Sequence, residues 1–155
     1  MKLSLLAATV AMCAGLGVAQ APSAKATKPL ATAELDVPGI VAEVIESTRR
    51  GDVLTVRVRF RNTGDKPASF NLASAGHYDS NYLTAADTKY PVLRDSNGYV
   101  VATPMNPGGD LTARIAKGGT WNWWAKFPAP PASVKTYALY LKVGPPIEDI
   151  PIVDK

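Results

Sequence analysis

A strict two-residue alternation is the sequence feature that most limits how this chain can fold. Between residues 54 and 61, apolar and polar side chains take turns along the chain. The apolar set is Leu54, Val56, Val58 and Phe60, and the polar set is Thr55, Arg57, Arg59 and Arg61. This period is typical of a β-strand with one buried face and one solvent-exposed face, because successive side chains point to opposite sides. A similar alternation returns between residues 137 and 143.

Turn-forming sequences separate the apolar segments at short intervals. They include Arg-Arg-Gly-Asp at 49–52, Asn-Thr-Gly-Asp-Lys-Pro at 62–67 and Asp-Ser-Asn-Gly at 95–98. Strands are expected at 40–45, 54–60, 70–72, 90–93, 99–102, 111–115, 120–127, 137–143 and 147–153. The turns at 49–52 and 95–98 should each close a hairpin, whereas 73–90 shows no regular pattern. With no helical periodicity after the N-terminal segment, the sequence predicts an all-β fold, a single antiparallel β-sandwich of seven to nine strands.

The first 19 residues have the character of a secretory signal peptide. Lys2 precedes an apolar run over residues 3–18, and small residues follow it. A basic start, a short apolar run and small residues before the cut are typical of such a peptide, and the run is too short for a membrane-spanning helix. We therefore expect cleavage near residues 19–21, export to the periplasm or the extracellular space, and no transmembrane span afterwards.

Residues 20–33 are rich in Ala, Pro, Thr and Lys and predict a flexible leader, followed by the β-sandwich domain at 34–155. The single cysteine, Cys13, lies in the segment expected to be removed, so the mature chain should form no disulfide. Loss of Lys2 lowers the formal net charge from +4 to +3. A charge this mild does not predict nucleic-acid binding.

Three segments carry a resemblance to a known family. They are Asn-Thr-Gly-Asp at 62–65, Tyr-Pro-Val-Leu-Arg-Asp at 90–95, and Trp-Ala-Lys-Phe-Pro-Ala-Pro-Pro at 124–131, the last followed by a Pro- and Ile-rich stretch at 145–152. Over about residues 38–153, the chain resembles a bacterial exported β-sandwich domain of unknown function that is sometimes found ahead of an OmpA-like domain.

The resemblance implies an immunoglobulin-like arrangement of the sandwich and a place in the cell envelope, and it implies no activity. No OmpA-like domain is expected here, because the chain ends at Lys155. Peptidoglycan binding is therefore not implied for this chain.

The densest aromatic segment, at 121–127, is the first candidate binding surface. On a strand, Trp121 and Trp123 share one face with Ala125 and Phe127, while Trp124 lies on the other face. The three tryptophans are candidates for a platform on which a sugar or a peptide stacks. The simpler interpretation is that they fill the core, because tryptophan is usually highly buried.

Three arginines on one strand face are the second candidate surface. Arg57, Arg59 and Arg61 would present a row of cations to lipopolysaccharide, phospholipid headgroups or wall polymers. The simpler interpretation is a solvated sheet face on which acids of a neighbouring strand, such as Glu43, pair with the arginines.

The sequence predicts no catalytic residue, no metal site and no cofactor. One histidine and one cysteine are too few for most metal sites, and the motifs of serine hydrolases, metalloproteases and phosphate-binding loops are absent. A hydrolase would have to be built around His77, with Asp79 close to it in sequence.

The favoured interpretation is an exported, non-catalytic module that mediates protein interaction, with an envelope protein or a cell-surface polymer as its partner. A carbohydrate- or wall-binding module that uses the tryptophans is the alternative, and a hydrolase around His77 is the third.

Overall fold

The computed structural model describes residues 27–74, 77–105 and 110–155. These residues form 12 strands and no helix, so the predicted all-β sandwich is confirmed. The strands are β1 (Ala31–Glu34), β2 (Ile40–Arg50), β3 (Val53–Asn62), β4 (Ala68–Ala73), β5 (Tyr82–Ala85), β6 (Thr88–Pro91), β7 (Ala102–Thr103), β8 (Leu111–Ile115), β9 (Thr120–Pro128), β10 (Thr136–Tyr140), β11 (Ile147–Pro151) and β12 (Val153–Asp154). Their number exceeds the predicted seven to nine because several strands are only two to four residues long.

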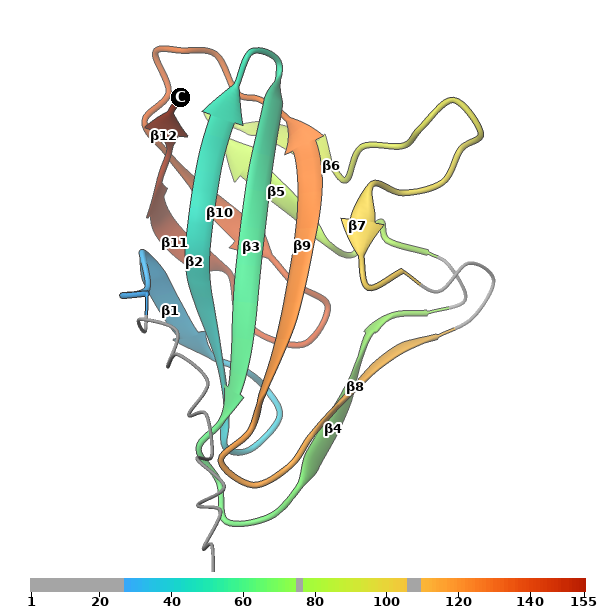
Figure 1. Ribbon diagram of the computed structural model, residues 1–155. Helices are drawn as coiled ribbons and strands as arrows, with labels where there is room; N and C mark the ends of the chain where they lie inside the picture. The colour runs from blue at the N-terminus through green and yellow to red at the C-terminus, as the bar shows by residue number, and fades with distance from the viewer. Residues whose placement is uncertain (1–26, 75–76, 106–109) are drawn as a thin grey trace, which may run out of the picture.

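The first layer is a sheet in the order β1-β2-β3-β9-β7, and Figure 1 shows its outer face. Its long central strands form an antiparallel hairpin, β2–β3, and β9 pairs with the other side of β3. Gly51 begins the loop of the hairpin with a φ of +54°, a conformation that glycine adopts without steric cost. The predicted hairpin at 49–52 therefore forms, but β2 runs on to Arg50 instead of ending at residue 45.

Two short terminal strands share the free edge of β2. A bulge at Ile45 separates the half of β2 that pairs with β1 from the half that pairs in parallel with β12. Because β1 starts at Ala31, regular structure begins earlier than the expected start near residue 34. The predicted signal peptide at 1–19 and Cys13 lie outside the described residues, as does the first half of the predicted leader, residues 20–26.

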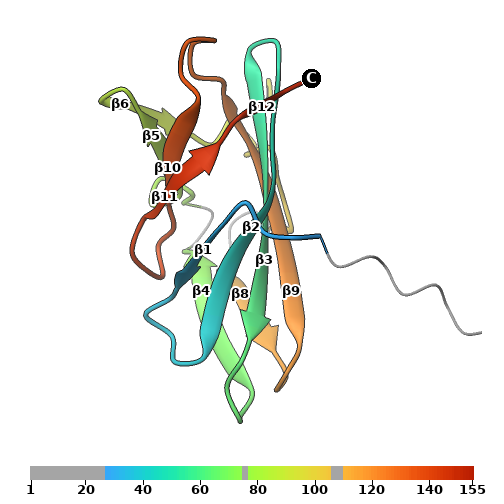
Figure 2. The same cartoon turned by 90° about the vertical axis from the view of Figure 1, so that its left-hand side faces the viewer.

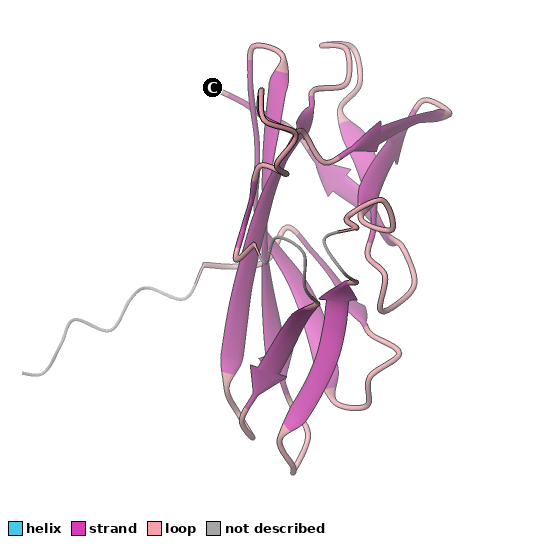
Figure 3. Ribbon diagram, turned by 90° about the vertical axis from the view of Figure 1, so that its right-hand side faces the viewer, coloured by secondary structure: helices cyan, strands magenta, loops and turns pink. Residues whose placement is uncertain are grey.

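The second layer has two parts. A four-stranded sheet in the order β11-β10-β5-β6 faces the upper half of the first sheet, and the β4–β8 pair faces its lower half (Figures 2 and 3). Phe60, Phe127 and Trp123 from the first layer pack in one core with Leu72, Leu83 and Leu139 from the second. The apolar set of the alternating segment 54–61 is fully buried, as the pattern predicted.

The hairpin β5–β6 is a difference from the sequence-based prediction, which found no regular pattern at 73–90. Its two-residue turn is Ala86–Asp87, with φ of +46° and +60°. Hairpin turns of this kind are usually marked by Asn or Gly, which tolerate positive φ. Asp87 also tolerates positive φ, so the turn carries only half of its usual sequence signal, with alanine at the other position.

The predicted hairpin around residues 95–98 forms only in part. Its turn is present, and the Asp95 carboxylate accepts hydrogen bonds from the backbone N–H groups of Asn97 and Tyr99. Only a single bridge, Arg94↔Val100, joins the flanking segments as β structure. Tyr90 belongs instead to β6, because it pairs with Leu83 of β5.

Candidate functional site

The outer face of β2, β3 and β9 is a regular grid, because the three strands are in register along most of their length. Two lower rows in the view of Figure 1 are Val41–Arg61–Thr120 and Glu43–Arg59–Asn122. Three upper rows are Glu46–Arg57–Trp124, Thr48–Thr55–Lys126 and Arg50–Val53–Pro128. Directly opposite residues lie close enough for their side chains to interact. Both halves carry cations, but they differ in the acids beside them.

In the lower rows, the acid is Glu43, which is only 4% exposed. Its carboxylate accepts hydrogen bonds from Arg59 Nε at 2.6 Å and from Arg61 Nε at 2.9 Å. Burial raises the pKa of Glu43, but the hydrogen bonds and charges of the two arginines outweigh burial, and the net pKa lies below its usual value. Arg59 and Arg61 therefore hold an internal carboxylate, as the simpler interpretation of the arginine row expected.

In the upper rows, the only ion pair that the described residues make on this face joins Arg57 to Glu46, with Nε 3.2 Å from the carboxylate. Both side chains are substantially exposed, at 46% and 35%, so solvent weakens this pair. Lys126 lies in the row next to that of Arg57, and Arg50 lies one row further. Neither cation forms an ion pair with a described residue.

Trp124 lies on this same outer face, opposite Arg57 on one side and Thr103 of β7 on the other. Its side chain is half-buried. We call the residues Arg50, Thr55, Arg57, Trp124 and Lys126 the outer basic patch. The patch thus joins one member of the predicted arginine row to one member of the predicted tryptophan set, and it adds two cations that were not among the candidate site residues.

The other two tryptophans lie on the inner side of the sheet, where Trp121 is partly buried against the core. Trp123 is fully buried in the core. Trp121 packs against Phe60 and Phe70, with ring centroids 5.5 and 6.2 Å apart. Neither indole shares a face with Trp124, because adjacent strand positions point to opposite sides. A platform of all three tryptophans is therefore not formed.

His77 lies at the surface and is joined to Ser74 through backbone hydrogen bonding. The carboxylate of Asp79 lies 3.7 Å from Arg94, with which it forms an exposed ion pair. Lys142 Nζ contacts the Ser74 hydroxyl, but this amine is exposed, whereas a lysine that activates a serine has to be desolvated. No arrangement of nucleophile, base and orienting acid is found around His77 among the described residues.

The described residues also contain no group of three or more His, Cys, Asp or Glu side chains that could hold a metal ion. Nor do they contain a helix long and apolar enough to cross a membrane.

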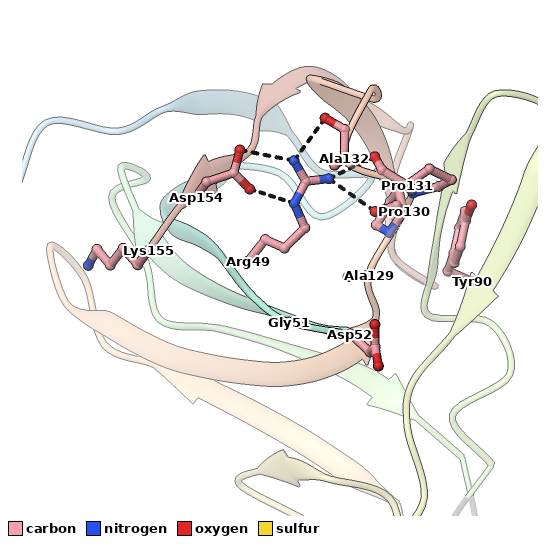
Figure 4. A pocket seen from close by; sticks show the side chains of 10 residues that line it. All are labelled: Arg49, Gly51, Asp52, Tyr90, Ala129, Pro130, Pro131, Ala132, Asp154 and Lys155. Carbon is pink, nitrogen blue, oxygen red and sulfur yellow. Dashed lines mark hydrogen bonds and ion pairs between the residues drawn. The ribbon is translucent and has the colours of Figure 1, made fainter.

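At the upper end of the sandwich, an open cavity of about 610 Å³ is lined by Arg49 and its neighbours (Figure 4). The Arg49 side chain is buried and points toward the second layer. Its guanidinium binds both carboxylate oxygens of Asp154 at 2.6 and 3.0 Å. It also donates to the carbonyls of Pro130, Pro131, Ala132 and Val134.

These bonds connect β2, β12 and the loop after β9, so Arg49 has a structural role. The Asp154 hydrogen bond raises the pKa of Arg49 and lowers that of Asp154. The sequence placed Arg49 in a turn and did not indicate this role, because the residues it binds are more than 80 positions away along the chain.

No protein-family model matches this chain, and no curated protein matches it. Among solved structures, the chain is similar to a functionally unknown protein from Listeria monocytogenes EGD-e. The two are 11% identical, the match covers 81% of this chain and 85% of that chain, and the TM-score is 0.41. The functional interpretation therefore depends on this chain's own residues.

Proposed function

We propose that this chain is an exported, non-catalytic module that mediates protein interaction through the outer basic patch. The observation that carries the proposal is the direct cross-strand pairing of Trp124 with Arg57 on an outer face. Tryptophan and arginine are among the residue types most enriched at the energetic centres of protein interfaces. Lys126 and Arg50 lie near them without an ion pair to any described residue, which favours a partner with an acidic surface.

A carbohydrate- or wall-binding module is less well supported by this geometry. Binding of a sugar by stacking usually relies on aromatic rings whose faces are open to solvent. Two of the three tryptophans lie on the inner side of the sheet. Trp124 is the one tryptophan on the outer face, and its ring is half-buried there. The charged side chains around Trp124 outnumber the aromatic ones, which favours recognition of an acidic protein surface.

The proposal is tested by capture followed by direct titration. Tagged protein is incubated with an extract of the cells that make it, and each captured protein is identified, purified and titrated by calorimetry. We expect a protein whose dissociation constant rises at least about tenfold on Arg57→Glu, because charge reversal places like charges opposite each other. Arg114→Glu is the matched control, since Arg114 is an exposed cation on β8, away from the patch.

Two results would contradict the proposal. The first is a captured protein that binds the Arg57→Glu and Arg114→Glu variants equally well. The second is recovery of glycan or wall material, and of no protein, in a manner that depends on Trp124. The second result would establish the carbohydrate-binding alternative instead.

A further inference from the structure

The lower rows of the outer face show how this sheet seats a carboxylate. Glu43 reaches across from β2 and lies between Arg59 and Arg61, two cations on the same face of β3. Its oxygens are 2.6 and 2.9 Å from the two Nε atoms. Each arginine thus takes one oxygen of the same carboxylate, and the acid is almost completely buried between them. The arginines of β3 therefore already bind one carboxylate, which belongs to the chain itself.

The upper rows continue the same strands, but no described acid stands opposite Thr55 or Lys126. Where Glu43 stands opposite Arg59, the corresponding pair two rows up is Thr48 opposite Thr55. Three cations surround Thr55 in the grid: Lys126 directly opposite on β9, Arg57 two residues along β3, and Arg50 diagonally across on β2. The one acid of these rows is Glu46, which pairs with Arg57. The upper rows therefore carry three positive charges and one negative charge.

We propose that the outer basic patch binds an extended acidic peptide segment of the partner, which places a carboxylate over Thr55 as Glu43 is placed between Arg59 and Arg61. This inference rests on the proposed function, because it names the part of the partner protein that the patch recognises. The acid would come from outside, because none of the described residues supplies one over Thr55. A carboxylate is the expected group because it is the one that the same strand already holds.

The spacing of the grid sets a pattern for the segment. Residues two apart on β3 are separated by about 6.6 Å, which is also the separation of side chains two apart in an extended peptide. An acidic residue over Thr55 therefore brings the residue two positions away over the next row, which holds Arg57 on β3 and, directly opposite it on β9, Trp124. An apolar side chain fits there, and the residue between the two faces solvent. The recognised pattern is an acidic residue and an apolar residue two positions apart.

The pattern is tested with two labelled peptides of identical composition, measured by fluorescence anisotropy with the purified protein. One repeats Glu-Ser-Leu-Ser, so that its acidic and apolar side chains share a face. The other repeats Glu-Leu-Ser-Ser, so that they alternate between faces. We expect the first to bind at least about tenfold more tightly in about 0.05 M salt and to weaken at about 0.5 M.

Thr55→Glu is the most direct test variant. It places a carboxylate of the protein among Arg50, Arg57 and Lys126, where it would compete with the acidic residue of the peptide. We expect it to reduce binding of the first peptide at least about tenfold, with the protein still folded by circular dichroism. Thr112→Glu is the matched control, since Thr112 is an exposed threonine on β8 outside the patch, and it should leave binding unchanged.

Four outcomes would overturn the inference. Equal affinity for the two peptides would show that charge alone is recognised. Equal weakening by Thr55→Glu and Thr112→Glu would place the peptide elsewhere. Failure of both peptides, while a captured protein still depends on Arg57, would overturn the acidic segment and leave the proposed function standing. If inorganic phosphate or a sulfated glycan displaces the first peptide while unlabelled peptide does not, the partner chemistry is not a peptide carboxylate.

Discussion

The lower and upper halves of the outer face are built from the same three strands, yet their cations have different roles. In the lower half, Glu43 is buried between Arg59 and Arg61 and satisfies both. In the upper half, the position opposite Thr55 is another threonine, Thr48, and no acid among the described residues forms an ion pair with Lys126. The lower cations thus hold a buried carboxylate, whereas the only ion pair among the described residues of the upper rows is the exposed one between Arg57 and Glu46.

The largest expected effect on stability comes from two adjacent tryptophans of β9, Trp123 and Trp124, whose side chains point to opposite faces of the sheet. Trp123→Ala should lower the free energy of unfolding by about 3–5 kcal/mol, because it leaves a cavity in the core. Trp124→Ala should cost less than about 1 kcal/mol, because this indole lies on the outer face. Urea denaturation followed by circular dichroism measures both. If Trp123→Ala does not fold, Trp123→Phe serves in its place. Equal losses would show that Trp124 belongs to the core and would remove it from the patch.

A smaller effect is expected at the acid that distinguishes the two halves. Glu43→Gln should lower the free energy of unfolding by about 2 kcal/mol, because it removes two charge-assisted hydrogen bonds at a buried position. Glu46→Gln is the matched control in the upper half and should cost less than about 0.5 kcal/mol, since its pair with Arg57 is exposed. Denaturant unfolding of both variants decides the point. Similar losses at the two positions would mean that the halves do not differ as described.

The smallest effect is the pH dependence of the lower half. Because the folded-state pKa of Glu43 is lowered, its stabilisation is fully present above the unfolded-state pKa of about 4.3 and is lost as pH falls through the folded-state value. The difference in unfolding free energy between wild type and Glu43→Gln should therefore shrink from pH 7 to about pH 3. Asp154 also has a lowered pKa, but it is present in both proteins and cancels in the difference. A difference that stays constant over this range would contradict the described role of Glu43.

The alternation at 54–61 correctly predicted both faces of β3, because side-chain direction along a strand is a local property. Turns with glycine, such as the one at Gly51, were also predicted correctly. The turn at Ala86–Asp87 was missed because alanine at its first position does not indicate positive φ, although aspartate tolerates it, and the hairpin β5–β6 was missed with it.

The candidate site was predicted in part. Arg57 and Trp124 were both among the candidate residues, but the sequence placed them on two separate surfaces. Their adjacency depends on the register between β3 and β9, which joins residues 67 positions apart. The simpler alternative for the arginine row was pairing with acids of a neighbouring strand, such as Glu43. Arg59 and Arg61 bind Glu43, and Arg57 pairs with Glu46 of the same strand.

The sequence by itself determined the all-β class, the burial of one face of β3 and the division of the tryptophans into two opposite sets. Each follows from the geometry of a single strand, which repeats every two residues. Only the tertiary structure decided which tryptophan set faces the core, which glutamate pairs with each arginine, and which cations form no ion pair with a described residue. Those outcomes depend on the register between strands and on the packing of two layers, and both involve residues far apart in the chain.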